Sequence, residues 1–179
     1  KAVSKIHPNL RKITNLKFCS IDDLENCDLL FLSLPHGKSQ KNIRKYMEMA
    51  PNIIDLSGDF RAKDQSHYKK WNDTPHLEPN LLKDFVYGIP ELYREEMRKA
   101  KYISSAGCNA TATILPLYPL YKEGIVVVDR TVTEVKVGSS EGGNLHSAAS
   151  HHPEKSGAIR TYKPSGHRHI AEMDQELGF

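Results

Sequence analysis

The chain contains 179 residues, 39% hydrophobic and 26% charged, which is typical of a globular protein of one domain or slightly more. Its 25 basic and 22 acidic side chains give a formal charge of +3, too balanced to indicate nucleic-acid binding, although it tolerates an anionic substrate or an acidic partner. The three cysteines include no CxxC pair, which favours a reducing compartment. No apolar stretch approaches the ~20 residues of a membrane span and no signal peptide is visible, so we expect the cytoplasm.

The first elements in chain order predict a parallel sheet. Residues 28–34 form a short, almost continuous apolar run, which is typical of a strand buried on both faces. Residues 39–49 have apolar side chains at helical spacing, and residues 52–57 have the pattern of a second strand. A strand, a helix and a strand in such a short stretch form a βαβ unit, which predicts a parallel sheet.

The next segment leads to a cysteine at a predicted turn. We expect a loop with short helices over residues 62–83, a turn at 86–90, a charged helix over 91–100 and a strand over 102–104. The small residues around Cys108 then predict a tight turn followed by a helix. A thiol at a helix N-terminus feels the positive end of the peptide dipoles, which favours the nucleophilic thiolate. The local pattern fits a nucleophile and a buried packing cysteine equally well.

Beyond Cys108 the composition changes, and we place a domain junction there. Residues 110–121 are apolar and predict a helix, which Pro116 and Pro119 should kink or shorten. Residues 125–137 are rich in valine and threonine and predict a long, half-exposed strand of antiparallel type.

Two polar segments are candidates for ligand binding. Residues 55–61, Asp-Leu-Ser-Gly-Asp-Phe-Arg, follow the second predicted strand, and we favour a ligand site there over a salt-bridged turn, because α/β sheets bind ligands at strand ends. Residues 138–143 are rich in glycine and serine and either cradle an anion or form a simple turn. They match no P-loop, and G-x-G-x-x-G occurs nowhere in the sequence.

Histidines are concentrated near the end of the chain. The last 34 residues hold five of the nine, namely His146, His151, His152, His167 and His169. No His-Glu-x-x-His signature or cysteine pair accompanies them, so we expect no metal. His167 and His169 would point the same way from a strand, and one of them would complete a thiolate–imidazole pair with Cys108. Nearby, Arg160, Lys163 and Arg168 either clamp an anionic substrate or are surface charges.

Five stretches in a fixed order carry a resemblance to a known family. They are residues 32–37, 55–61, 87–92, 107–112 and 166–172. With them the chain resembles the N-acetyl-gamma-glutamyl-phosphate reductase family, an α/β family. It is most similar to the archaeal and lysine-pathway branch, which acts on glutamyl or aminoadipyl phosphate held by an amino-group carrier protein. Two departures are Ala106, where the family usually has proline, and residues 138–143, which differ from the loop of the acetylglutamate branch.

The resemblance implies the fold and the reaction. Residues 1–108 would form a Rossmann-like NADP-binding domain without its N-terminal strand and glycine-rich loop. Residues 109–179 would begin an α+β catalytic and dimerisation domain of a homodimer or homotetramer. The missing methionine at Lys1 and the end at Phe179, soon after a helix-like stretch starts, are expected of a fragment. The implied reaction is NADPH-dependent reduction of an acyl phosphate to a semialdehyde in arginine or lysine biosynthesis.

The resemblance also implies residue roles. The Cys108 thiolate would attack the acyl carbon and release phosphate, and His167, or failing that His169, would be the acid–base partner. Free N–H groups at the start of the following helix would stabilise the thiolate and an oxyanion. Cofactor contacts would come from Ser33, Leu34, Pro35 and Gly107, and substrate or phosphate contacts from Arg61, Asn109, Arg160 and Arg168. Two alternatives are a cysteine hydrolase or acyltransferase without nicotinamide, which the absent G-x-G-x-x-G favours, and an inactive binding or folding unit.

Overall fold

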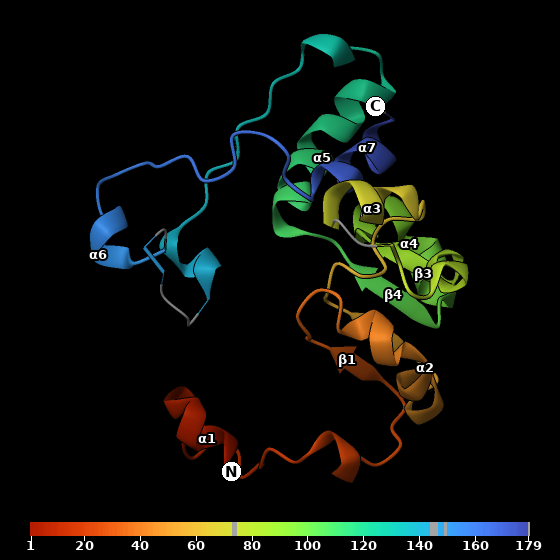
Figure 1. Cartoon of the computed structure of the whole chain (residues 1–179), viewed down its shortest axis with the longest axis vertical. Helices are drawn as coiled ribbons and strands as arrows, with labels where there is room; N and C mark the ends of the chain where they lie inside the picture. The colour runs from red at the N-terminus through yellow and green to blue at the C-terminus, as the bar shows by residue number, and fades with distance from the viewer. Residues whose placement is uncertain (73–74, 144–146, 149, 179) are drawn as a thin grey trace.

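The structure is a computed structural model that describes residues 1–72, 75–143, 147–148 and 150–178. Its centre is a four-stranded parallel sheet in the order β1-β2-β4-β3 (Figure 1). The strands are β1 (Leu30–Leu32), β2 (Ile53–Asp55), β3 (Phe85–Gly88) and β4 (Tyr102–Ser105). Because all four are parallel, their carboxyl ends meet at one edge of the sheet, where α/β proteins bind ligands.

Helices connect and cover these strands. The helix α2 (Ser39–Met49) joins β1 to β2, and α4 (Pro90–Lys99) joins β3 to β4. Beyond the sheet lie α5 (Cys108–Lys122) and α7 (Ile170–Leu177), which pack against each other. The short helices are α1 (Val3–Ile6), α3 (Ser66–Asn72), α6 (His152–Lys155) and the 3-10 turns Pro8–Leu10, Ile21–Asp23, Pro79–Asp84, Val128–Arg130 and Ser139–Gly142.

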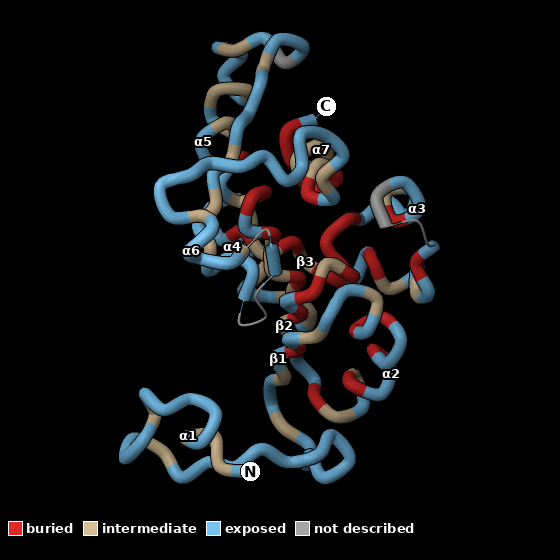
Figure 2. Tube along the Cα trace, turned by 60° about the vertical axis from the view of Figure 1, so that its left-hand side comes forward, coloured by how far each residue is buried: buried red, intermediate tan, exposed pale blue. Residues whose placement is uncertain are grey.

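Two apolar clusters hold the fold together. The larger one joins α2 to the sheet, where Ile43 is fully buried and Phe60 stacks on Phe85 with ring centroids 4.1 Å apart. The second joins Tyr87 of β3 to Ile114 of α5 and to the end of α7. Figure 2 shows that the buried residues gather around the sheet, α2 and α7, whereas the N-terminal segment and the region around α6 are mostly exposed. No helix in the described part of the chain is long and apolar enough to cross a membrane.

The predicted βαβ unit is confirmed, because β1 and β2 pair in parallel on either side of α2. The turn predicted at residues 86–90 is wrong, since β3 occupies Phe85–Gly88 and pairs in parallel with β4. Its alternation of buried Phe85 and Tyr87 with half-buried Val86 and Gly88 is the pattern of a strand with one face in the core.

Beyond Cys108 one expectation is wrong and another is confirmed in part. Residues 125–137, predicted as a strand, contain no strand in the structure, and Val132 is 94% exposed. A strand needs a neighbour for its N–H and C=O groups, and none of the described strands lies beside this segment. The helix predicted over residues 110–121 is confirmed as part of α5, which is not shortened by Pro116 and Pro119 but continues through both to Lys122.

Candidate active site

Cys108 is the first residue of α5, and Gly107 is its N-cap, two residues after the carboxyl end of β4. The thiol is exposed, and its Sγ lies 3.7 Å from Oδ1 of Asn109. The first helical turn is closed by Thr111, whose backbone N–H and Oγ1 both donate to the carbonyl of Gly107, at 2.8 and 2.9 Å. The sulfur therefore lies at the free N–H end of a 15-residue helix, which favours a negative charge there.

Gly107 is in such close contact with α7 that no side chain fits. A Cβ added to it would lie 2.6 Å from Oε1 of Glu172 and 2.7 Å from Nε2 of His169. Its φ of −69° and ψ of 144° are open to any residue, so the requirement for glycine is spatial. The turn that carries Cys108 is therefore packed directly against a histidine and a carboxylate.

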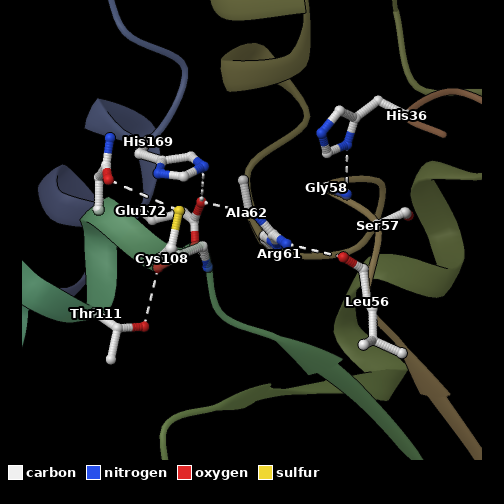
Figure 3. A network of polar contacts seen from close by, with 12 residues as sticks. His36, Leu56, Ser57, Gly58, Arg61, Ala62, Cys108, Thr111, His169 and Glu172 are labelled. Carbon is white, nitrogen blue, oxygen red and sulfur yellow. Dashed lines mark hydrogen bonds and ion pairs between the residues drawn. The ribbon is translucent and has the colours of Figure 1, made fainter. Parts of the chain in front are cut away.

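His169 is the histidine that lies against this turn (Figure 3). It is the N-cap of α7 and only 4% exposed, and its Nδ1 has no hydrogen-bond partner. Burial, reinforced by the positive charges of His167, Arg61 and Arg168, lowers its pKa to about 3. The imidazole is therefore neutral near pH 7.

His167 belongs to the same cluster but faces another neighbour. The two histidines lie in the turn before α7, not in the predicted strand, and their ring centroids are 4.5 Å apart. The backbone N–H of His169 donates to Nδ1 of His167, whose Nε2 lies 3.4 Å from the hydroxyl of Tyr162. That hydroxyl also accepts from Nδ2 of Asn109, at 3.1 Å. Burial, followed by the charges of Arg168 and Lys163, lowers the pKa of His167 as well.

Glu172, to which the sequence analysis assigned no role, is central to the site. It is 4% exposed, and its Oε2 accepts hydrogen bonds from the backbone N–H of Gly107 (2.8 Å) and from the hydroxyl of Tyr87 (2.6 Å). Its Oε1 pairs with Nη1 of Arg61 at 3.4 Å. The sequence signal was an acidic residue three positions after His169, which on a helix lies on the same face.

Two of the predicted phosphate-binding arginines lie near this cluster and one does not. Arg61 and Arg168 line a small cavity together with His36, His67 and Glu172. The buried Arg61 also donates to the carbonyl of Leu56 at 2.9 Å, and its Nε has no partner. Two guanidinium groups thus face one cavity, where Glu172 already pairs with that of Arg61. Arg160 instead pairs with the exposed Glu154 of α6 at 3.5 Å.

The predicted cofactor residues lie at the carboxyl end of β1. Ser33 and Pro35 are exposed and Leu34 is half-buried. Ser33 and Leu34 end a groove along β1 that is otherwise lined mainly by apolar side chains, and such a groove suits the flat ring of a nicotinamide or an adenine. The backbone N–H of Gly58 donates to Nδ1 of His36 at 2.7 Å, which joins the loops after β1 and β2. These residues fit one side of a dinucleotide site.

Of the remaining candidate segments, residues 138–143 act on this cluster through the charge of Glu141, which raises the pKa of His167 against the larger lowering effects. Residues 138–143 contain the 3-10 turn Ser139–Gly142, and Oγ of Ser139 lies 3.0 Å from Nδ1 of His152. His146 lies outside the described residues. Among the residues that the structure does describe, no three His, Cys, Asp or Glu side chains form a group that could hold a metal.

Comparisons with known proteins cover nearly the whole chain. Residues 1–100 match a family described as semialdehyde dehydrogenase, NAD binding domain, and residues 108–179 match semialdehyde dehydrogenase, dimerisation domain. A protein of Thermomicrobium roseum, provisionally named LysW-L-2-aminoadipate 6-phosphate reductase, is 52% identical over 99% of this chain and 51% of its own length.

Other relatives have similar names. The LysW-L-2-aminoadipate/LysW-L-glutamate phosphate reductase of Saccharolobus solfataricus is 49% identical over 99% of this chain and 51% of its own. The LysW-L-2-aminoadipate 6-phosphate reductase of Deinococcus radiodurans is 47% identical over 98% of this chain and 50% of its own. The chain thus spans about half the length of the curated relatives that it matches.

Proposed function

The chain belongs to the semialdehyde dehydrogenase family, and from this premise we propose that it reduces a carrier-linked aminoadipyl or glutamyl phosphate to the semialdehyde through a thioester on Cys108. The observation that most supports this is the position of Cys108 at the N-terminus of α5, on a turn packed against a neutral histidine. The names of the relatives support the substrate class.

The first half of the reaction uses this chain's own residues. A neutral His169 takes the proton of the Cys108 thiol, and the sulfur attacks the acyl carbon. A bond forms between the sulfur and the acyl carbon, and the bond between the acyl carbon and the phosphate oxygen breaks. Phosphate leaves with the electron pair of that bond. The N–H groups at the start of α5 stabilise the negative charge on the acyl oxygen. Arg61 and Arg168, in the cavity beside Glu172, hold the phosphate.

We place His169 ahead of His167 as the acid–base group. His169 lies against Gly107, whereas Nε2 of His167 is directed to the hydroxyl of Tyr162. In this arrangement His167 positions His169 through the bond from the His169 backbone N–H to Nδ1 of His167. Asn109, which is bonded to Tyr162, would contact the acyl chain.

The second half needs a nicotinamide cofactor, which we propose to be NADP. When bound, the reduced cofactor would supply a hydride to the acyl carbon. The C–S bond would then break, which releases the semialdehyde and returns the sulfur of Cys108 as a thiolate. In this chain Ser33, Leu34 and Pro35 would hold the cofactor at the carboxyl end of β1. Gly107, which the sequence analysis placed beside the cofactor, packs instead against Glu172 and His169.

The wider assignments are also proposals. Residues 1–108 would serve cofactor binding and residues 109–179 catalysis and dimerisation. The partners would be an acidic amino-group carrier protein and a second copy of the chain, in the cytoplasm.

The function is tested by assaying the reaction in reverse, as the reduction of NADP by the semialdehyde in the presence of phosphate. The chain is expected to reduce NADP only when phosphate is present, and Cys108→Ser should abolish this, while Cys27→Ser at the second free cysteine retains it. Turnover in Cys108→Ser would overturn the covalent route. Acylation of Cys108 without nicotinamide reduction would favour the acyltransferase alternative.

A further inference from the structure

The carboxylate of Glu172 connects three separate parts of the chain. Oε2 holds the backbone of Gly107, next to the reactive cysteine, and the hydroxyl of Tyr87 at the end of β3. Oε1 faces Arg61, in the loop after β2. Figure 3 shows Glu172 between the turn that carries Cys108 and Arg61.

We propose that Glu172 is a positioning residue that holds the Gly107–Cys108 turn and His169 in one reactive arrangement. The inference depends on the proposed function only in taking Cys108 as the nucleophile. The carboxylate fixes the turn through the backbone, because Gly107 has no side chain by which it could be held.

The same carboxylate also has an electrostatic relation to His169. Nε2 of His169 lies 3.9 Å from Oε1 of Glu172, which is longer than a hydrogen bond while the imidazole is neutral. A proton transferred from Cys108 to this ring would create a cation next to an anion in a buried site. Glu172 would therefore stabilise the imidazolium as it forms, as an acidic residue does in triads of nucleophile, base and carboxylate.

A second carboxylate on α7 allows the positioning role of Glu172 to be distinguished from a purely structural role in holding α7 against the rest of the fold. Glu176 lies one turn further along the same helix and accepts a hydrogen bond from the hydroxyl of Tyr93, also at 2.6 Å. Its other described partner is the side chain of Gln175. Tyr87 and Tyr93 thus both bind α7 through a carboxylate. Only Tyr87 is bonded to Glu172, the carboxylate that also binds the backbone of Gly107.

The test compares Tyr87→Phe with Tyr93→Phe in the full chain. Each variant loses one phenol–carboxylate hydrogen bond of the same length. The readout is the alkylation rate of Cys108 by iodoacetamide from neutral to alkaline pH, followed by peptide mass spectrometry. Cys19 and Cys27 serve as internal references, and urea unfolding reports the stability of each variant.

We expect Tyr87→Phe to slow alkylation of Cys108 about fivefold or more near neutral pH, the scale of one lost hydrogen bond, and Tyr93→Phe to keep the wild-type rate. Equal rates in the two variants would overturn the inference, however much stability each one loses. If Tyr87→Phe does not fold, Glu172→Gln replaces it with the same expected slowing, since the amide fills the same volume but leaves Arg61 without its anion.

The outcome is separable from that of the proposed function. Iodoacetamide needs no acyl phosphate, so a Tyr87 effect on alkylation in a chain that forms no thioester would sustain the positioning role and contradict the reaction. If both tyrosine variants form the thioester at equal rates, the proposed reaction is supported and the positioning role is contradicted.

Discussion

We expect Gly107→Ala to push α7 away from the cysteine turn and to lower the stability of the chain and the reactivity of Cys108 together. The new Cβ would lie 2.6 Å from Oε1 of Glu172 and 2.7 Å from Nε2 and Cε1 of His169. Ordinary contacts are about 3.5–4 Å, so two buried side chains must retreat by about 1 Å.

The expected magnitude follows from two opposing effects. Overpacking of a buried site costs about 1–3 kcal/mol. The alanine also restricts the unfolded chain, which stabilises the protein by about 0.4–1 kcal/mol where the backbone angles are compatible, as they are here. The net loss should be about 1–2 kcal/mol, measured by urea unfolding, with slower alkylation of Cys108 by iodoacetamide.

Gly138→Ala is the matched control. Gly138 has a φ of −76°, and the nearest atom to its added Cβ is Oγ of Ser140, at 3.8 Å. This variant should be as stable as the wild type or up to about 1 kcal/mol more stable. If Gly107→Ala is as stable as Gly138→Ala and its Cys108 reacts at the wild-type rate, the close packing of the turn is refuted.

Arg61→Met should lower the free energy of unfolding in urea by about 3–5 kcal/mol, because it leaves Glu172 buried without its cation. Adding Glu172→Gln to this variant should recover part of the loss. If the losses of the two single variants simply add up in the double variant, the ion pair between Arg61 and Glu172 is contradicted. Burial holds the pKa of His169 at about 3, below its ordinary value, so its contribution to stability is present above about pH 6.5 and is lost as the pH falls towards 3. The free energy of unfolding of His169→Asn should therefore fall less than that of the wild type between pH 7 and pH 5. If the two proteins lose stability in parallel over this range, a buried neutral imidazole is excluded. Phe60→Ala should cost about 3–5 kcal/mol, because the ring is 1% exposed and stacked on Phe85, and a loss below about 1 kcal/mol would contradict the stacked core.

Local patterns predicted the parallel sheet and the position of Cys108. The apolar run ending at Leu34 and the helical spacing of Ile43 and Tyr46 depend only on neighbours along the chain, so their periods are visible in the sequence. The turn before Cys108 was predictable for the same reason, and α5 begins at that residue.

The rest of the site depends on contacts between distant residues. Glu172 meets Tyr87 and Gly107, 85 and 65 positions earlier in the chain, and no local pattern reports such a contact. The choice between His167 and His169 likewise needed the packing of α7 on the cysteine turn. The strand expected over residues 125–137 failed because strand propensity alone cannot supply a neighbouring strand.

The most direct test of the central claim is the mass of the chain after reaction with an acyl phosphate, with acetyl phosphate as the simplest probe, alongside the phosphate released. We predict one acyl group per chain, located on the Cys108 peptide, removed by hydroxylamine and matched by one phosphate. An acyl group on another residue, or an unmodified Cys108 in a folded chain, would contradict the thioester mechanism.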